Sequence, residues 1–128
     1  MNSLILPLLL LLSPQSTSPA APIDYLQAKR LADRDEASVT DPAKQALLSA
    51  QAQLLDAGVA HCNQQPLRKD RTPFVVVMQL DSDGHITATW RQGESPLAIC
   101  LQRYVRDQTL IKPPQAPFYA ALEISFTQ

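Results

Sequence analysis

The chain has 128 residues, of which 45% are hydrophobic and 18% are charged, and its formal net charge is -1. This composition is typical of one globular domain with its own hydrophobic core. Because basic residues are neither in excess nor gathered in one stretch, we expect no nucleic-acid partner and no electrostatic attraction to an anionic membrane.

Residues 1–20 are predicted to be a signal peptide. They carry no charged side chain, are apolar from Leu4 to Leu12, and end in small residues, with Ser18 and Ala20 at the spacing of a cleavage site. The apolar run is only about nine residues, whereas a helix needs about 20 to cross a bilayer. We therefore expect a periplasmic or secreted protein without a transmembrane anchor.

A charged lead and a long helix are expected next. Residues 21–41 are only loosely periodic and are either a helix or a mobile segment. A helix is predicted from Pro42 to about Ala60, because Asp41 is a good capping residue and proline fits the first helical turn. Gly58 predicts fraying near the end of this helix. The expected apolar stripe is Ala43, Leu47, Ala50, Leu54 and Ala57, widened by Leu48 and Leu55.

A β-hairpin is predicted after the polar loop that follows. From Phe74 to Leu80, apolar residues occupy both faces, which is typical of a central strand. The acidic turn Asp81–Gly84 leads into a half-exposed second strand. In that strand one face is expected to hold Ile86, Ala88 and Trp90, and the other Thr87, Thr89 and Arg91.

Ser95 and Pro96 predict the start of a second helix, again by a cap followed by proline. Its expected buried face is Leu97, Cys100, Leu101, Tyr104 and Val105. This helix should stop before Lys112, and the proline-rich segment to Pro117 is interpreted as a rigid connector. In the third strand, Phe118, Ala120, Leu122, Ile124 and Phe126 alternate with Tyr119, Ala121, Glu123 and Ser125.

The order helix, strand, strand, helix, strand predicts a two-layer α+β domain. The second helix returns the chain to the side of the sheet from which it started, so the third strand runs in the direction of the second. An all-antiparallel sheet then requires the third strand to lie beside the first. The predicted order is 2-1-3, with the second and third strands at the edges.

Two cysteines in an exported protein usually pair, because the compartment is oxidising. Cys62 and Cys100 form the only possible bridge within the chain. The bridge closes a loop of roughly 40 residues, for which loop entropy gives on the order of 3 to 4 kcal/mol of stabilisation. A structural disulfide is expected, because no Cys-x-x-Cys spacing indicates a redox pair.

The segment from Gly93 to Phe126 resembles the C-terminal domain of TolA. It combines a glycine-acid opening, a proline and a cysteine at the start of a helix, a basic and apolar run into paired prolines, and a last strand ending in phenylalanine. The similarity to the TolA/TonB C-terminal superfamily extends from Ala43 to Phe126, and FVVVMQLDSDGHI is similar to the first hairpin of that family. Residues 42–128 are therefore expected to be a TolA/TonB-like domain.

The resemblance implies a non-enzymatic module that binds cell-envelope proteins, partly through an exposed strand edge. The implied partners are Tol- or Ton-type envelope components, or foreign ligands such as bacteriocin and phage coat domains. TolA and TonB themselves have a membrane anchor and a long periplasm-spanning segment. Neither is recognised in this sequence, so we do not expect the chain to transmit energy between membranes.

Five residues of the expected edge strands are candidate protein-binding residues: Trp90, Tyr119, Ala121, Glu123 and Ser125. Aromatic side chains are favoured at the centres of interfaces. For Trp90 the alternative is a core role beside the second helix, and a core role is equally open for Tyr119.

No catalytic residue, metal or cofactor is expected. Ser95 lies in a sequence that lacks the second glycine of a nucleophile elbow, so it is interpreted as a helix cap. Four ligand-type residues lack the paired spacing of a structural zinc site, namely His61, Cys62, His85 and Cys100. Two alternatives to a binding module stay open, a small periplasmic hydrolase on this scaffold and a purely structural envelope protein.

Overall fold

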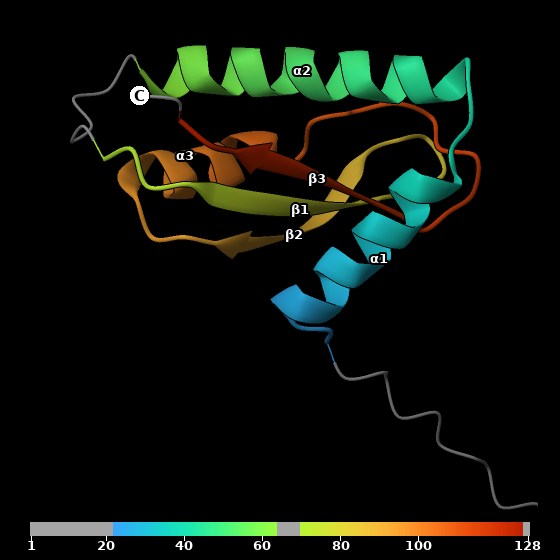
Figure 1. Ribbon diagram of the computed structural model, residues 1–128, viewed down its shortest axis with the longest axis horizontal. Coiled ribbons are helices and arrows are strands. Elements are labelled where there is room, and N and C mark those ends of the chain that lie inside the picture. The colour runs from blue at the N-terminus through green and yellow to red at the C-terminus, as the bar shows by residue number, and fades with distance from the viewer. Residues whose placement is uncertain (1–21, 64–69, 127–128) are drawn as a thin grey trace, which may run out of the picture.

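The computed structural model describes residues 22–63 and 70–126, so the predicted signal peptide lies outside the described residues. Six elements follow one another, namely α1 (Tyr25–Ser38), α2 (Ala43–Cys62), β1 (Phe74–Leu80), β2 (Ile86–Gln92), α3 (Pro96–Val105) and β3 (Phe118–Ile124). Figure 1 shows that α2 runs along the β3 side of the sheet and that α1 crosses in front of the sheet. In the part of the chain that is described, no helix has the length and hydrophobicity needed to cross a membrane.

The three strands form one antiparallel sheet in the order β2-β1-β3. Val77, at the middle of β1, lies opposite Trp90 of β2 on one side and opposite Ala121 of β3 on the other. The predicted α+β class and strand order are confirmed, and α1 adds a helical layer that the two-layer prediction did not include. The central place of β1 explains why both of its faces are apolar, since one layer of helices covers each.

The first face of the sheet carries the main core, which α3 covers. From the sheet this core contains Phe74, Val76, Met78, Leu80, Ile86, Phe118, Ala120, Leu122 and Ile124.

The predicted cap of α3 is confirmed, because the Ser95 hydroxyl accepts a hydrogen bond of 3.1 Å from the Ala98 amide. The buried side of α3 is rotated from the predicted one, since Ala98 and Gln102 are buried while Leu97 and Tyr104 are half-buried.

The charged lead is a helix, α1, and it covers the second face of the sheet. It begins with a capping box, in which the Asp24 carboxylate accepts from the Gln27 amide at 2.8 Å and the Gln27 side chain accepts from the Asp24 amide at 2.9 Å. Ala28 and Ala32 are fully buried against the sheet. Small side chains at these positions let the helix approach the strands closely.

The start of α2 differs from the prediction. The helix begins at Ala43, and its N-cap is Pro42 with no side-chain capping bond, so the predicted Asp41 cap is wrong. The helix continues to Cys62, past the predicted end. Gly58 does not fray the helix, because it is buried where α2 meets α3, and a Cβ atom there would lie 2.4 Å from Leu101 Cδ1.

The buried side of α2 is narrower than the predicted stripe. Leu47 and Leu54 are buried as predicted, whereas Ala43 and Ala57 are exposed and Leu48 is 48% exposed. The reason is that α2 lies at the margin of the sheet and packs mainly against α3 (Figure 1). One row of its apolar residues is therefore left outside the core.

The predicted disulfide is confirmed. Cys62 at the end of α2 is bonded to Cys100 in α3, and their Cα atoms are 6.0 Å apart. Together with the close approach at Gly58, this bond fixes the C-terminal half of α2 on α3.

A bulge in the hairpin changes the faces of β2. The register shifts at Gln79/Leu80, so that Ile86 lies opposite Leu80 while Ala88 lies opposite Gln79. Ile86 therefore joins the core beneath α3, whereas Trp90 lies on the α1 face. The prediction that these two β2 residues share one face is wrong, because it assumed an unbroken alternation.

The hairpin turn is closed by the segment that leads from α3 to β3. The Leu110 amide donates to the Gly84 carbonyl at 2.9 Å, and the Ile86 amide donates to the Gln108 carbonyl at 2.9 Å. Gly84 has a φ of 84°, and a Cβ atom there would lie 2.0 Å from the Ile111 carbonyl oxygen. Only glycine combines this backbone conformation with this approach.

Candidate protein-binding groove

The free edge of β3 presents main-chain groups away from β1. The Tyr119 amide donates to the Asp35 carboxylate at 3.0 Å, and the Ala121 carbonyl accepts from the Gln51 side-chain amide at 3.0 Å. The amide and the carbonyl of one residue in a strand point to the same neighbour. The remaining outward groups are therefore the Tyr119 carbonyl, the Ala121 amide and both main-chain groups of Glu123, and no side chain among the described residues pairs with them.

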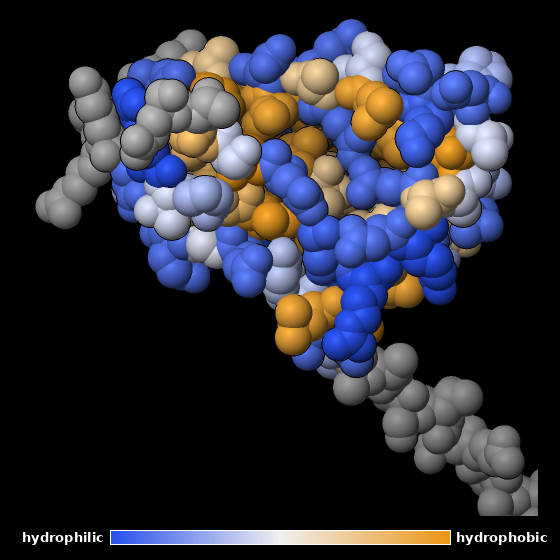
Figure 2. All heavy atoms as spheres, in the orientation of Figure 1, coloured by the Kyte–Doolittle hydropathy of each residue, from blue (hydrophilic) through white to orange (hydrophobic). Residues whose placement is uncertain are grey.

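A groove of about 500 Å³ runs along this edge between α1 and α2. Its walls are Asp33, Glu36 and Ala37 of α1 and Lys44, Leu47, Leu48, Gln51, Ala52 and Leu55 of α2, and Ala121, Leu122 and Glu123 of β3 form its floor. Figure 2 shows the hollow beside α2, with apolar atoms inside it and polar atoms around it. Its volume is within the range of ligand sites, about 300 to 1,000 Å³.

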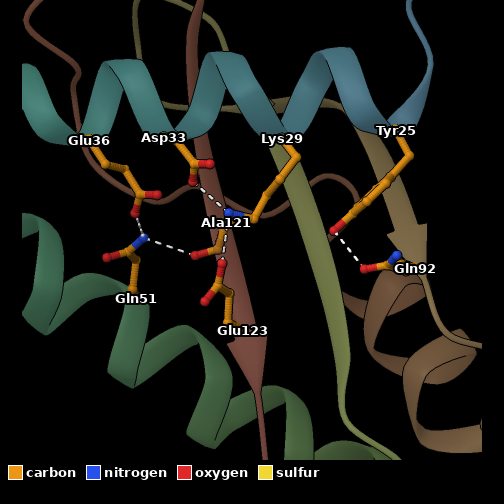
Figure 3. A network of polar contacts seen from close by, with 8 residues as sticks. All are labelled: Tyr25, Lys29, Asp33, Glu36, Gln51, Gln92, Ala121 and Glu123. Atoms are coloured by element: carbon orange, nitrogen blue, oxygen red, sulfur yellow. Dashed lines mark hydrogen bonds and ion pairs between the residues drawn. The ribbon is translucent and has the colours of Figure 1, made fainter.

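A polar network crosses the groove (Figure 3). Gln51 reaches from α2 over the β3 edge, and its side-chain amide donates both to the Glu36 carboxylate and to the Ala121 carbonyl. On the other side, the Lys29 ammonium lies 2.5 Å from Asp33 and 2.8 Å from Glu123. Lys29 thus forms ion pairs with two carboxylates, whereas Glu36 accepts a hydrogen bond from a neutral amide.

Burial and neighbouring charges shift two pKa values in this network. Burial raises the pKa of Glu36 above its ordinary value, and the charges of Asp33 and Glu123 add to the rise, against the hydrogen bond from Gln51 and the charge of Lys29. Burial opposes the charge on Lys29, but the hydrogen bonds to Asp33 and Glu123 outweigh it and raise the pKa of Lys29. Lys29 is therefore a fixed cation, and Glu36 is a destabilised anion.

The two aromatic candidates are covered by α1. Tyr119 is 9% exposed, and Trp90 is half-buried with its ring centre 5.9 Å from that of Tyr119. The indole nitrogen of Trp90 donates to the Ile23 carbonyl at 2.9 Å. Both side chains pack in a smaller core between α1 and the second face of the sheet. For Trp90 the covering helix is therefore α1 and not the second predicted helix, α3.

The other three candidates lie on or near the edge. The Ala121 side chain is 8% exposed, but its carbonyl faces the groove. Glu123 has an exposed side chain and lines the groove. Ser125 lies past the end of β3 and lines a second hollow of about 300 Å³, to which Phe74 and Glu123 also contribute.

The sequence did not indicate the side chains that line or flank the groove, namely Lys29, Asp33, Glu36 and Gln51, or the bond of Asp35 to the β3 edge. Most of them lie on α1, whose capping box at Asp24 and Gln27 was a usable signal of a helix. Ala28, Ala32 and Asp35 also have helical spacing, but alanine carries little hydrophobic signal. The position of α2 over the edge has no local sequence signal.

Ser95 and the two cysteines have structural roles. Ser95 is buried and caps α3, and both cysteines are joined in the disulfide. Within residues 22–63 and 70–126, no group of three or more histidine, cysteine or acidic side chains is placed to hold a metal ion.

Comparison with known proteins gives no relative from which to assign a family. No protein-family model, curated protein or solved structure matches the chain.

Proposed function

We propose that this chain is an exported, non-enzymatic protein-binding module that pairs an extended segment of a cell-envelope protein with the edge of β3. The observation that carries the proposal is the row of outward main-chain groups on Ala121 and Glu123 along the floor of a groove. Unpaired strand edges recruit a further strand, because each added residue satisfies exposed amides and carbonyls. The apolar side chains of the groove supply area for burial.

The resemblance to TolA and TonB C-terminal domains supports the choice of partner class. Tol- or Ton-type components are the proposed partners, and bacteriocin or phage coat domains are the alternatives. The disulfide supports export, because such bonds persist in oxidising compartments. Export is tested by the intact mass of the protein recovered from the periplasm, which should be that of residues 21–128.

Site-specific photo-cross-linking tests the binding surface. A photoreactive amino acid is placed at Leu48, an exposed residue that lines the groove, and in a matched variant at Leu26, which is 60% exposed and lies outside the groove lining. We expect irradiation of cells to give envelope-protein adducts from position 48 and not from position 26. Equal yields of the same adducts from both positions would place the binding surface elsewhere.

A proline substitution tests main-chain pairing. The Glu123 amide points away from β1, so Glu123→Pro removes an outward donor and spares the hydrogen bonds between β1 and β3. Glu123→Ala is the matched control, since it also removes the carboxylate but keeps the amide. We expect the proline variant to lose at least about 1 kcal/mol of binding relative to the alanine variant. Equal affinities of two folded variants would count against strand pairing.

A further inference from the structure

We propose, on the basis of the function proposed above, that the groove selects an extended segment with a basic residue between two apolar residues. The basic side chain is a lysine or arginine that binds Glu36 in place of Gln51. The apolar neighbours enter the side of the groove that is formed by the leucines of α2. The partner is thus defined by a local pattern, apolar-basic-apolar, in an exposed or disordered segment.

The direction of the side chains along β3 gives this pattern. Tyr119 and Ala121 pack against α1, Glu123 is paired with Lys29 of α1, and Leu122 faces the main core under α3. Residues directly opposite each other on paired strands place their side chains on the same face of the sheet. The partner residue opposite Ala121 therefore points toward α1, where Asp33 and Glu36 lie (Figure 3).

The neighbours of that residue point the other way. On that side the groove is lined by Leu47, Leu48, Leu55 and Leu122. Leu48 is 48% exposed, although it lies on the row of α2 that was expected to be apolar and buried. Apolar partner residues on both sides of the basic one would cover this surface.

The charge balance favours a cation at the central position. The groove has three carboxylates, those of Asp33, Glu36 and Glu123, and Lys44 is the only basic residue in its lining. Lys29, beside the groove, is committed to Asp33 and Glu123. Glu36 is half-buried, its side-chain hydrogen bond comes from the neutral amide of Gln51, and burial raises its pKa although the charge of Lys29 lowers it. A cation on Glu36 would relieve this unfavourable burial of charge.

Gln51 marks where the partner binds. Its side-chain amide donates to both Glu36 and Ala121, a combination that a partner can reproduce with two groups. The main-chain amide of the partner would donate to Ala121, and its ammonium or guanidinium group would donate to Glu36. Bonds to a charged donor are stronger than those to a neutral amide, so the exchange is favourable. Gln51 lies on the surface of α2 and can turn outward, since it is not fully buried.

Fluorescence anisotropy with short labelled peptides tests this selectivity. The probes share flanking residues and differ at the centre, which is Val-Lys-Val, Val-Arg-Val, Val-Gln-Val or Val-Glu-Val. We expect the lysine and arginine peptides to bind the oxidised protein at least about tenfold more tightly than the glutamine peptide, which corresponds to about 1.4 kcal/mol. The glutamate peptide should bind most weakly. Higher salt should reduce the preference for the basic peptides.

Three variants assign the effect to the groove. Glu36→Gln should remove most of the difference between the lysine and glutamine peptides. Glu94→Gln is the matched control, because it removes a carboxylate that lies between β2 and α3, near the opposite edge of the sheet, and should leave the preference unchanged. Gln51→Ala should tighten binding of every peptide several-fold, because no bond to Ala121 then has to be broken.

The possible outcomes separate the two proposals. If all four peptides bind equally and Glu123→Pro weakens all of them relative to Glu123→Ala, edge pairing stands and the basic selectivity is wrong. If the preference for lysine persists in Glu36→Gln, the selectivity does not arise from this groove and the inference is overturned. It is also overturned if none of the peptides binds, because the pattern would then not define a ligand.

Discussion

The carboxylate of Asp35 accepts a hydrogen bond of 3.0 Å from the main-chain amide of Tyr119. Asp35 is 1% exposed, and its second oxygen accepts from the Arg34 guanidinium at 3.1 Å. This bond connects α1 to the outer edge of β3 and satisfies a buried amide that points away from β1. Asp35 therefore occupies the β3 edge at Tyr119, and Gln51 covers the same edge at Ala121.

Replacing Asp35 by alanine should destabilise the fold. Loss of the acceptor leaves the Tyr119 amide buried and unpaired, which costs about 1 to 3 kcal/mol. Asp35→Asn keeps an acceptor and should lose less. Asp41→Ala is the control, because Asp41 is exposed and makes no capping bond, and its effect should be within about 0.5 kcal/mol. Urea unfolding gives the free energy of unfolding of the three variants. An equal decrease in Asp35→Ala and Asp41→Ala would contradict the prediction.

Removal of the disulfide should destabilise the fold and loosen α2 in particular. The loop-entropy contribution is about 3 to 4 kcal/mol for the paired Cys62→Ser and Cys100→Ser substitutions. Because α2 packs mainly on α3, amide exchange should rise more in α2 than in β1. The bond itself is checked by intact mass, which should increase on reduction by the mass of two hydrogen atoms. An unchanged mass would show that the bond does not form.

Gly84→Ala should be strongly destabilising. The positive φ of this residue alone costs an L-residue roughly 1 kcal/mol, and the new Cβ atom would meet the Ile111 carbonyl at 2.0 Å. The main chain must then move, which disrupts the bond between Leu110 and Gly84. Gly84→Asn separates the two effects, since asparagine tolerates a positive φ but still has a Cβ atom. If thermal unfolding of Gly84→Asn resembles that of the parent, the close approach is not restrictive.

The ionisation of Glu36 should make the protein less stable as pH rises. Because the pKa of Glu36 is raised in the folded state, the folded protein holds the proton more tightly than the unfolded chain does. The stabilising contribution is present below the ordinary pKa of 4.5 and is lost as pH rises toward the raised value. Glu36→Gln has no such loss, so its stability relative to the parent should improve with pH.

Urea unfolding below pH 4.5 and above neutrality measures this difference. Glu94→Gln makes the same substitution at a side chain that is 84% exposed, and its effect should be small at both pH values. If Glu36→Gln changes the free energy of unfolding by the same amount at both pH values, Glu36 ionises normally in the folded protein and the prediction is wrong.

Much of the sheet was predictable, because its pattern is local. β1 has apolar residues on both faces, which indicated a central strand, and the return of the chain through α3 in an all-antiparallel sheet required β3 to lie beside β1. The faces of β2 were not predictable, because the bulge at Gln79/Leu80 inserts a residue without a glycine or proline to indicate it. A single extra residue exchanges the two faces.

The groove was beyond sequence reasoning for a different physical reason. It depends on where two helices lie relative to one strand edge, and Glu36 and Gln51, fifteen residues apart along the chain, meet only after both helices have packed. The sequence did indicate a β3 edge with Ala121 and Glu123 on it. It did not indicate that α1 covers Tyr119 and Trp90, because the alanines that allow close packing resemble those of an exposed helix.

The position of Trp90 gives the molecule a built-in optical reporter. Trp90 is the only tryptophan in the chain, and its indole is hydrogen-bonded to the Ile23 carbonyl just before α1. Indole emission depends on solvation, so the intrinsic fluorescence of Trp90 should change when α1 separates from the sheet, and no added label is needed. Since α1 also forms one wall of the groove, the same signal can follow a ligand that displaces this helix.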